Sequence, residues 1–211
     1  MEFSQSAREL VRAGRISDPA GPRGRLLREA AILFREVGYE RTTVRMLADK
    51  VGIQSGSIFH HFRSKEEILE AVMEETVILN TAIQDKAVAA AGSPAARLRA
   101  LILCELRAIN KETGDAMSVL HYEWRCLSRP RQQKILRLRD RYESNWMDAL
   151  GAMVEAGLVR EDIFVLRRLL TGAIGWTVNW FRPDGPLSLE DLADRILGLT
   201  LRRDPALPSS L

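Results

Sequence analysis

Apolar residues recur every three or four positions along almost the whole chain, and strict alternation of apolar and polar residues is nearly absent. The eight prolines stand between these periodic segments and never inside one. Such spacing is typical of amphipathic helices and disfavours a sheet as the main scaffold. The sequence therefore predicts an all-α fold of about nine helices.

The limits of these helices follow from capping residues and from breaks in the pattern. Ser64 and Glu67 form a capping box, Ser93-Pro94 and Ser188 open two further helices, and Thr42 or Thr43 caps a short one. Residues 1–24 are expected to form an N-terminal tail, because loop residues dominate its second half. The expected helices span residues 25–37, 43–50, 54–61, 64–89, 94–111, 116–127, 130–156, 161–180 and 188–202.

Charge is unevenly distributed along the chain. The total of +3 is too small to indicate a partner, but residues 1–65 carry 12 Lys and Arg against 7 Asp and Glu. The remaining residues are slightly acidic and contain all four tryptophans. A basic N-terminal part joined to an acidic, aromatic C-terminal part is therefore expected, and the basic part can attract phosphate.

Several classes of protein are disfavoured by the composition. The longest uncharged stretch has 13 residues, too few to span a bilayer, and no secretory signal is visible. Cys104 and Cys126 form no disulfide framework, which fits a reducing compartment. We expect a cytoplasmic protein with no membrane partner and no cofactor.

Two short helices near the N-terminus have the proportions of a helix-turn-helix. Val51-Gly52-Ile53 separates them, and Gly52 permits the tight turn. Six residues are spaced to form the small core between the helices: Val44, Leu47, Ala48, Val51, Ile53 and Ile58. The second helix then presents short polar groups and a glycine, which suits entry into a major groove. Its outward residues are Gln54, Ser55, Gly56, Ser57, Phe59 and His60.

The segment of residues 25–75 resembles the N-terminal domain of the TetR family of bacterial transcriptional repressors. The resemblance rests on FREVGYERTTV, LADKVGI and SGSIFHHFRSKEEI taken together. It implies a homodimer that binds a palindromic operator and is released by a small ligand in the C-terminal domain. Residues 25–70 would form the DNA-binding domain, and residues 71–211 the ligand-binding and dimerisation domain.

The resemblance also assigns roles by position. Arg45, Gln54, Ser55 and Ser57 would contact base edges or lie next to them, and Gly56 would let the backbone approach the DNA. The expected phosphate contacts are Thr43, Phe59, His60 and Lys65. Phe59 departs from the family, which usually has a tyrosine there whose hydroxyl bonds a phosphate.

Other interpretations of the N-terminal part remain open. The adjacent His60 and His61 do not favour a metal site, because neighbouring helical residues point about 100° apart and no third ligand is near. Arg15, Arg23 and Arg25 could form an arm that reaches the minor groove. A disordered tail is the alternative.

The last two expected helices have broad apolar faces. Residues Phe164, Leu170, Ile174, Trp180, Leu192, Ile196 and Leu199 are expected to form a four-helix bundle between two subunits. Gly172 and Gly175 would allow close helix approach. Ordinary core packing within one subunit is the alternative.

The preceding helices combine aromatic residues and methionine with a few polar groups, which suits an apolar ligand with a polar head. The segment GWTVNWFRPDGPLSLEDLA resembles TetR-type regulators of fatty-acid, sterol or other acyl-CoA catabolism. An acyl-CoA or fatty acid is therefore the expected effector. The candidate ligand residues are Leu103, Leu106, Arg107, Met117, Leu120, His121, Trp124, Tyr142, Trp146 and Trp176.

The sequence leaves two other functional classes to consider, an enzyme and a regulator that binds a protein partner. A nucleophile pair of Cys104 and His121 could support catalysis, but the chain shows no oxyanion motif and no glycine-rich phosphate loop. We therefore expect no enzymatic activity. A DNA-binding regulator whose C-terminal domain binds a protein partner is the second alternative.

Overall fold

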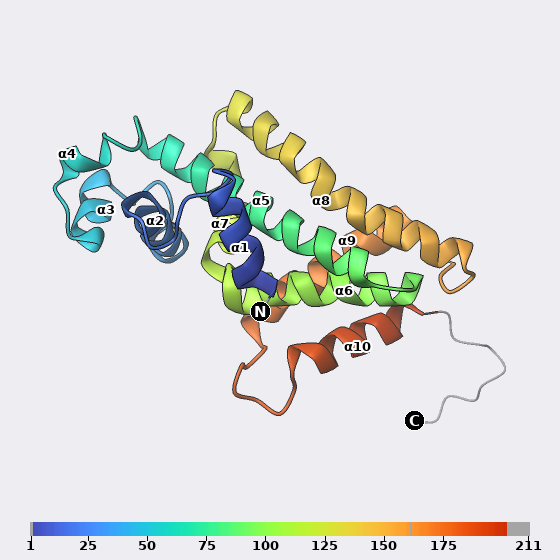
Figure 1. The fold of residues 1–211 in the computed structure, drawn as a ribbon. Helices are drawn as coiled ribbons and strands as arrows, with labels where there is room; N and C mark the ends of the chain where they lie inside the picture. The colour runs from blue at the N-terminus through green and yellow to red at the C-terminus, as the bar shows by residue number, and fades with distance from the viewer. Residues whose placement is uncertain (1, 161, 202–211) are drawn as a thin grey trace. The chain divides into compact units, whose positions relative to one another are not determined.

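The computed structural model describes residues 2–160 and 162–201, and within them every regular element is helical (Figure 1). The all-α expectation is confirmed. None of the helices in these residues is both long and apolar enough to cross a membrane. The helices are α1 (Glu2–Arg12), α2 (Pro22–Val37), α3 (Val44–Val51), α4 (Ser55–Ile58), α5 (Lys65–Ala90), α6 (Pro94–Arg107), α7 (Gly114–Tyr122), α8 (Arg129–Glu155), α9 (Ile163–Trp176) and α10 (Leu189–Thr200).

The chain divides into two compact units, which are described separately. The first contains the described residues of Met1–Ile83 and Lys111–Tyr142, and the second those of Gln84–Asn110 and Glu143–Leu211. Helices α5 and α8 each contribute their first part to the first unit and their second part to the other.

The N-terminal segment is folded, so the expected tail is wrong for residues 2–24. It begins with α1, and its chain then packs on α2 and α5. The backbone N–H and Oγ of Ser17 donate to the Glu75 carboxylate at 2.9 and 2.7 Å. A Cβ on Gly24 would lie 2.0 Å from the Asp18 carbonyl oxygen. The sequence interpretation missed this packing because its partner residues lie more than fifty positions away.

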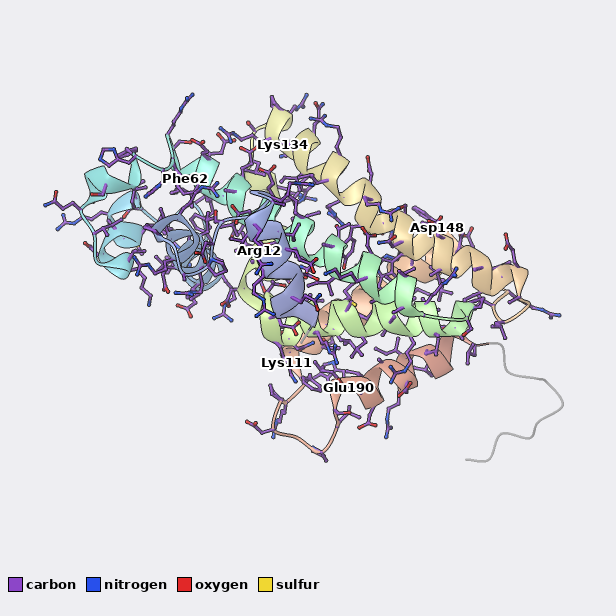
Figure 2. All side chains as sticks on the ribbon, viewed as in Figure 1. Arg12, Phe62, Lys111, Lys134, Asp148 and Glu190 are labelled. Atoms are coloured by element: carbon purple, nitrogen blue, oxygen red, sulfur yellow. The ribbon has the colours of Figure 1, made fainter. Side chains whose placement is uncertain are left out.

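The first unit is built around α2, whose inner face is buried. Leu26, Ala30 and Phe34 are at most 1% exposed, and Phe34 packs edge-to-face on Tyr39. Figure 1 shows α3 and α4 next to α2 at one end of this unit. Phe62, labelled in Figure 2, is buried after α4 and lies under the Arg23 guanidinium. Arg23 also bonds Glu75 and Ser17, so it is not part of a free arm.

The second unit has an apolar core and an ionic edge. Helices α6 and α10 pack together, and Arg107 pairs with Glu190 at 2.7 Å. Figure 2 labels Glu190 at the start of α10. The core residues, all less than 10% exposed, include Leu98, Leu101, Ile102, Leu106, Ala149, Leu150, Met153, Leu189, Leu192, Ala193 and Ile196.

The helix starts predicted from the sequence agree with the structure better than the predicted helix ends do. Thr43, Ser93 and Ser188 each accept the expected capping hydrogen bond from a backbone N–H. At α5, Ser64 accepts from the Glu67 N–H, but the Glu67 carboxylate turns back to the N–H of Arg63.

Three expected helices end early in tighter or wider turns. A π-helical turn (Ala108–Glu112) follows α6, and 3-10 turns (Trp124–Cys126 and Thr177–Asn179) follow α7 and α9. Thr177 explains the last of these breaks. Its hydroxyl donates to the Ile174 carbonyl at 2.6 Å and accepts from the Asn110 amide at 2.8 Å. Side-chain bonds of this kind compete with the helical ladder.

Candidate nucleic-acid interface

The turn between α3 and α4 has the expected geometry. Gly52 adopts the left-handed conformation (φ 76°, ψ 35°), and the next N–H, from Ile53, donates to the Ala48 carbonyl at 3.0 Å. Leu47, Ala48 and Ile58 are at most 1% exposed and join the two helices. Ile53, by contrast, is exposed and does not belong to this core. The structure thus presents a helix-turn-helix with a small, buried apolar centre.

Most residues predicted to face DNA are accessible. Gln54, Gly56, Phe59 and His60 are exposed, while Ser55 and Ser57 are half-buried. A Cβ on Gly56 would meet no atom of the described chain within 4 Å. The backbone at Gly56 can therefore be approached closely from outside.

Arg45 lies on α3, and Thr43 caps the start of this helix. The Arg45 side chain is 85% exposed, and its only ion pair among the described residues is a 4.0 Å contact with Asp49. Thr43 is exposed, and its hydroxyl oxygen caps α3 by accepting from the Met46 N–H at 3.2 Å. Thr42 is buried instead and donates to the Gly38 carbonyl at 2.8 Å.

Lys65, predicted to contact phosphate, is held inside the first unit. Its Nζ donates to the carbonyls of Tyr39, Glu40 and Thr42 at 2.7, 3.2 and 2.8 Å. An ammonium group has three donors, so all of them are used. The predicted phosphate contact stays untested, and the structure gives Lys65 another role, because it ties the start of α5 to the loop that precedes α3.

The Lys65 amine also lies 4.2 Å from the centre of the Tyr39 ring, within the range of a cation–π contact. Burial raises the pKa of the Tyr39 hydroxyl to about 12, with smaller contributions from the Glu66 and Glu40 carboxylates. The loop of residues 39–42 is thus fixed by an ammonium group on one side and by a neutral phenol on the other.

A row of carboxylates on α5 faces bases on α8, which the sequence interpretation did not identify. Arg131 pairs with Glu66 and Glu70, and Lys134 pairs with Glu70 and Glu74. The sequence signal was the spacing of acids by four residues on one helix and of bases by three on the other. Figure 2 labels Lys134 on α8.

The acidic row is also bonded to the backbone at the start of α8. The N–H of Ser128 donates to Glu66 at 2.7 Å, and this bond lowers the pKa of the Glu66 carboxyl. A carboxylate at the first turn of a helix also complements its dipole.

The adjacent His60 and His61 are both exposed. Among the residues that the structure describes, no three His, Cys, Asp or Glu side chains gather as a metal site.

The candidate ligand residues divide between the two units. Met117, Leu120, His121, Trp124 and Tyr142 belong to the first unit, and the others to the second. Most are partly or fully buried. The exceptions are His121, which is exposed, and Trp176, which is 65% exposed.

The predicted dimer residues also divide into two groups. Leu170, Ile174, Leu192 and Ile196 are buried within the chain's own second unit, so the alternative of core packing applies to these four. Phe164, Trp180 and Leu199 are 58%, 47% and 79% exposed.

The exposed apolar surface of α9 includes residues outside the predicted dimer set. Val165 and Leu169 are 51% and 65% exposed, and Trp176, predicted as a ligand residue, is exposed with them. A Cβ on Gly172 or Gly175 would meet no described atom within 4 Å. Among the described residues, the predicted close helix approach is therefore not made. We call Phe164, Val165, Leu169, Gly172 and Trp176 the α9 face.

Comparison with known proteins gives two family matches. Residues 26–72 match the family of bacterial regulatory proteins called tetR, and residues 91–203 match the tetracyclin repressor-like C-terminal domain. The second match alone covers more than half of the chain. The HTH-type transcriptional repressor KstR2 of Mycobacterium tuberculosis is 32% identical over 181 residues, which cover 85% of this chain and 90% of the relative.

Solved structures agree with these matches. The structure of M. tuberculosis KstR2, described as a ketosteroid transcriptional regulator, superimposes with a TM-score of 0.79 at 30% identity, covering 90% of this chain and all of that one. AibR in complex with isovaleryl coenzyme A and operator DNA gives 0.75 at 25% identity, covering 84% and 96%. A protein described as superantigen pfit gives 0.82 at 50% identity, covering 95% and 100%.

Members of this family bind operator DNA, dimerise and regulate transcription without catalysing a reaction. The helix-turn-helix of α3 and α4, the two family matches and the KstR2 likeness agree across both parts of the chain. The chain belongs to the TetR family of bacterial transcriptional regulators.

Proposed function

We propose that this protein is a ligand-responsive repressor whose dimer binds a palindromic operator and leaves it when an effector binds the C-terminal domain. The observation that carries the proposal is the surface of α4, where accessible polar groups and a glycine lie over a fully buried apolar centre. Residues 25–70 act as the DNA-binding domain and residues 71–211 as the effector and dimerisation domain. Its target is chromosomal DNA, so it acts in the cytoplasm.

The DNA contacts follow from accessibility and chemistry. Arg45 and Gln54 carry the long side chains that reach base edges, because an arginine fork suits guanine and a carboxamide suits adenine. Ser55 and Ser57 bond at shorter range, and Gly56 brings the backbone against the duplex. The sugar-phosphate backbone is contacted by Thr43, Phe59 and His60.

Dimerisation uses the α9 face, together with Trp180 and Leu199. Large apolar side chains left exposed in one chain mark a surface that is buried in an assembly. The open space over Gly172 and Gly175 admits a second helix at short distance. A two-fold dimer places two recognition helices about 34–36 Å apart, one turn of DNA.

The dimer is tested by sedimentation at micromolar concentration. The native chain should sediment as a dimer, and Leu169→Glu should yield monomers, because it places a charge at the centre of the α9 face. Leu136→Glu, the same change at an exposed leucine of α8 outside the α9 face, is the matched control and should leave the dimer intact. A monomeric native chain would remove the proposed interface.

The effector is an apolar molecule, with an acyl-CoA or fatty acid as the leading class. Two similarities support this choice: AibR was solved with isovaleryl coenzyme A, and KstR2 is described as a ketosteroid regulator. Effector binding releases the operator by favouring a spacing of the two recognition helices that does not fit successive major grooves. Such a population shift requires that the effector bind the two states with different affinity.

The operator is tested by selecting bound fragments from genomic DNA, first with the native protein and then with Gly56→Ala. The native protein should enrich a palindrome, and Gly56→Ala should lose affinity for it at an unchanged melting temperature, because its methyl group points into open space. Gly151→Ala on α8, which is equally unobstructed, is the matched control. If the native protein enriches no sequence, the proposal is wrong.

A protein partner for the C-terminal domain is the second candidate, because the α9 face could also dock another chain. Operator binding by a monomer, without a response to any small molecule, would favour this alternative over a dimeric effector sensor.

A further inference from the structure

Two deeply buried polar side chains in the second unit have no hydrogen-bond partner among the described residues. Gln84 on α5 is 1% exposed, and both its Oε1 and its Nε2 are unbonded. Trp146 on α8 is completely buried, and its Nε1–H is also unbonded. Buried polar groups are nearly always satisfied in native proteins, so each of these atoms calls for a partner that the described residues do not supply.

The direction of α5 and α8 shows how these two residues lie. In the first unit, the α5 partners of Lys134 lie one helical turn beyond those of Arg131, so the two helices run parallel. Helices α5 and α8 are each unbroken through positions 84–85 and 145–146, so the order of residues along them is the same there. In the second unit, the Asn145 amide donates to the Asp85 carboxylate at 2.8 Å, so positions 85 and 145 face each other.

Gln84 precedes one of these facing positions, and Trp146 follows the other. Successive residues turn by about 100° around a helix axis. In two parallel helices that face each other, the residue before the contact on one and the residue after it on the other therefore turn to the same side. Gln84 and Trp146 lie on one side of the α5–α8 pair.

The charges next to Trp146 indicate what kind of group can bind there. Its ring lies 4.1 Å from the Cζ of Arg167, which is 3% exposed. Arg167 already pairs with Glu105 at 3.3 Å and with Glu143 at 3.0 Å. A guanidinium matched by two carboxylates offers no charge to an incoming carboxylate or phosphate. A neutral oxygen avoids this difficulty.

We propose that Gln84 and Trp146 together bind a neutral keto or hydroxyl oxygen of the effector, whose remaining surface there is apolar. A ketone accepts from the Trp146 Nε1–H and the Gln84 Nε2–H. A hydroxyl accepts from Trp146 and donates to the Gln84 Oε1. The inference rests on the proposed function, because it names the chemistry of the effector, and it places a neutral part of that molecule, not an anionic one, in the second unit.

The test is calorimetric binding of three ten-carbon probes, 2-decanone, 2-decanol and decanoate, to the full chain without DNA. The native protein should bind the ketone and the alcohol more tightly than the carboxylate. Gln84→Met keeps the side-chain length and removes both polar atoms, and it should weaken the two neutral probes about tenfold. Gln133→Met makes the same change at an exposed position of α8 and should alter none of the affinities.

A second measurement separates binding from structure. In the ligand-free protein, Gln84→Met removes a buried amide without partners, so the melting temperature should rise. Higher stability with lower ketone affinity is the signature of a binding residue. Trp146→Phe keeps the ring over Arg167 and removes only the N–H and part of the indole, so it should weaken ketone binding in the same way.

Three results would overturn the inference: decanoate binding at least as tightly as the ketone, ketone affinity unchanged in Gln84→Met, or a fall in the melting temperature of that variant. All these measurements omit DNA. A protein that binds the ketone through Gln84 but selects no operator contradicts the proposed function alone. A protein that binds an operator and ignores the neutral probes contradicts the effector chemistry alone.

Discussion

The helix-turn-helix and the second unit place polar and apolar side chains in opposite ways. Around α3 and α4, the long polar residues Arg45 and Gln54 are exposed, and Leu47, Ala48 and Ile58 form a buried apolar centre. In the second unit, Arg167 and Gln84 are buried, while α9 exposes phenylalanine, leucine and tryptophan. The first arrangement places exposed polar side chains over a buried apolar centre, which suits the binding of a polyanion such as DNA. The second arrangement is expected of a domain that binds two other molecules. An effector would supply hydrogen bonds inside it, and a second subunit would supply apolar contacts at its surface.

The largest effect should come from Arg167→Met. It removes the guanidinium that pairs with the buried Glu105 carboxylate at 3.3 Å, and breaking a buried pair in this way destabilises by about 3–5 kcal/mol. The measurement is the free energy of unfolding in urea. Arg137→Met, at an exposed position of α8, should change it by less than about 0.5 kcal/mol.

A second substitution shows whether charge is the cause. Adding Glu105→Gln to Arg167→Met removes the negative charge that Arg167 had faced and should recover part of the lost stability. If Arg167→Met is as stable as the native protein, Arg167 does not form a stabilising buried ion pair. The contrast between the two regions would then lose its strongest example.

Lys65→Met should have the next largest effect. It removes three hydrogen bonds to carbonyls and the cation on Tyr39, and charged hydrogen bonds of this kind suggest a loss of about 2 kcal/mol in the free energy of unfolding. Lys50→Met, on an exposed position of α3, is the matched control. A Lys65 variant with native stability but weaker DNA binding at low salt would restore the phosphate role predicted from the sequence.

Lys65 also marks the limit of what the sequence could predict. The helix-turn-helix was predicted correctly because its determinants are local: a cap at Thr43, a left-handed glycine at position 52 and apolar residues spaced over two short helices. The carbonyls that bind Lys65 lie 23 to 26 residues earlier, so no local sequence pattern predicts these contacts. The packing of the N-terminal segment at Ser17 was missed for the same reason, since its partner Glu75 lies 58 residues away.

The candidate effector and dimer residues show a different limit. The sequence placed Leu170 and Phe164 together on one apolar helix, but periodicity alone does not say which side of the helix meets the chain's own core. The structure buries the first and exposes the second. Gln84 gave no sequence signal, because a glutamine within a helix is ordinarily a solvated residue.

Arg45→Ala should weaken operator binding about ten- to a hundredfold, because a bidentate base contact is lost. Stability should be unchanged, since the side chain is 85% exposed. The operator is the sequence selected by the native protein, and affinity is measured by fluorescence anisotropy with mismatched duplexes as competitors. If the variant keeps both its affinity and its sequence preference, Arg45 does not contact the bases of the operator.

Phe59→Tyr should produce the smallest change, a gain in operator affinity. The ring is 55% exposed at the end of α4, so a hydroxyl on it can reach solvent or a phosphate without disturbing the buried Ile58 beside it. One added hydrogen bond to phosphate should tighten operator binding about fivefold. The measurement is operator affinity at two salt concentrations, with Phe181→Tyr, a half-buried phenylalanine of the second unit, as the matched control. Because one neutral hydroxyl adds no charge, the salt dependence should stay as it is while the affinity rises. An unchanged affinity would mean that the ring at position 59 does not face the DNA backbone, and it would show that this exposed side of α4 is not all recognition surface.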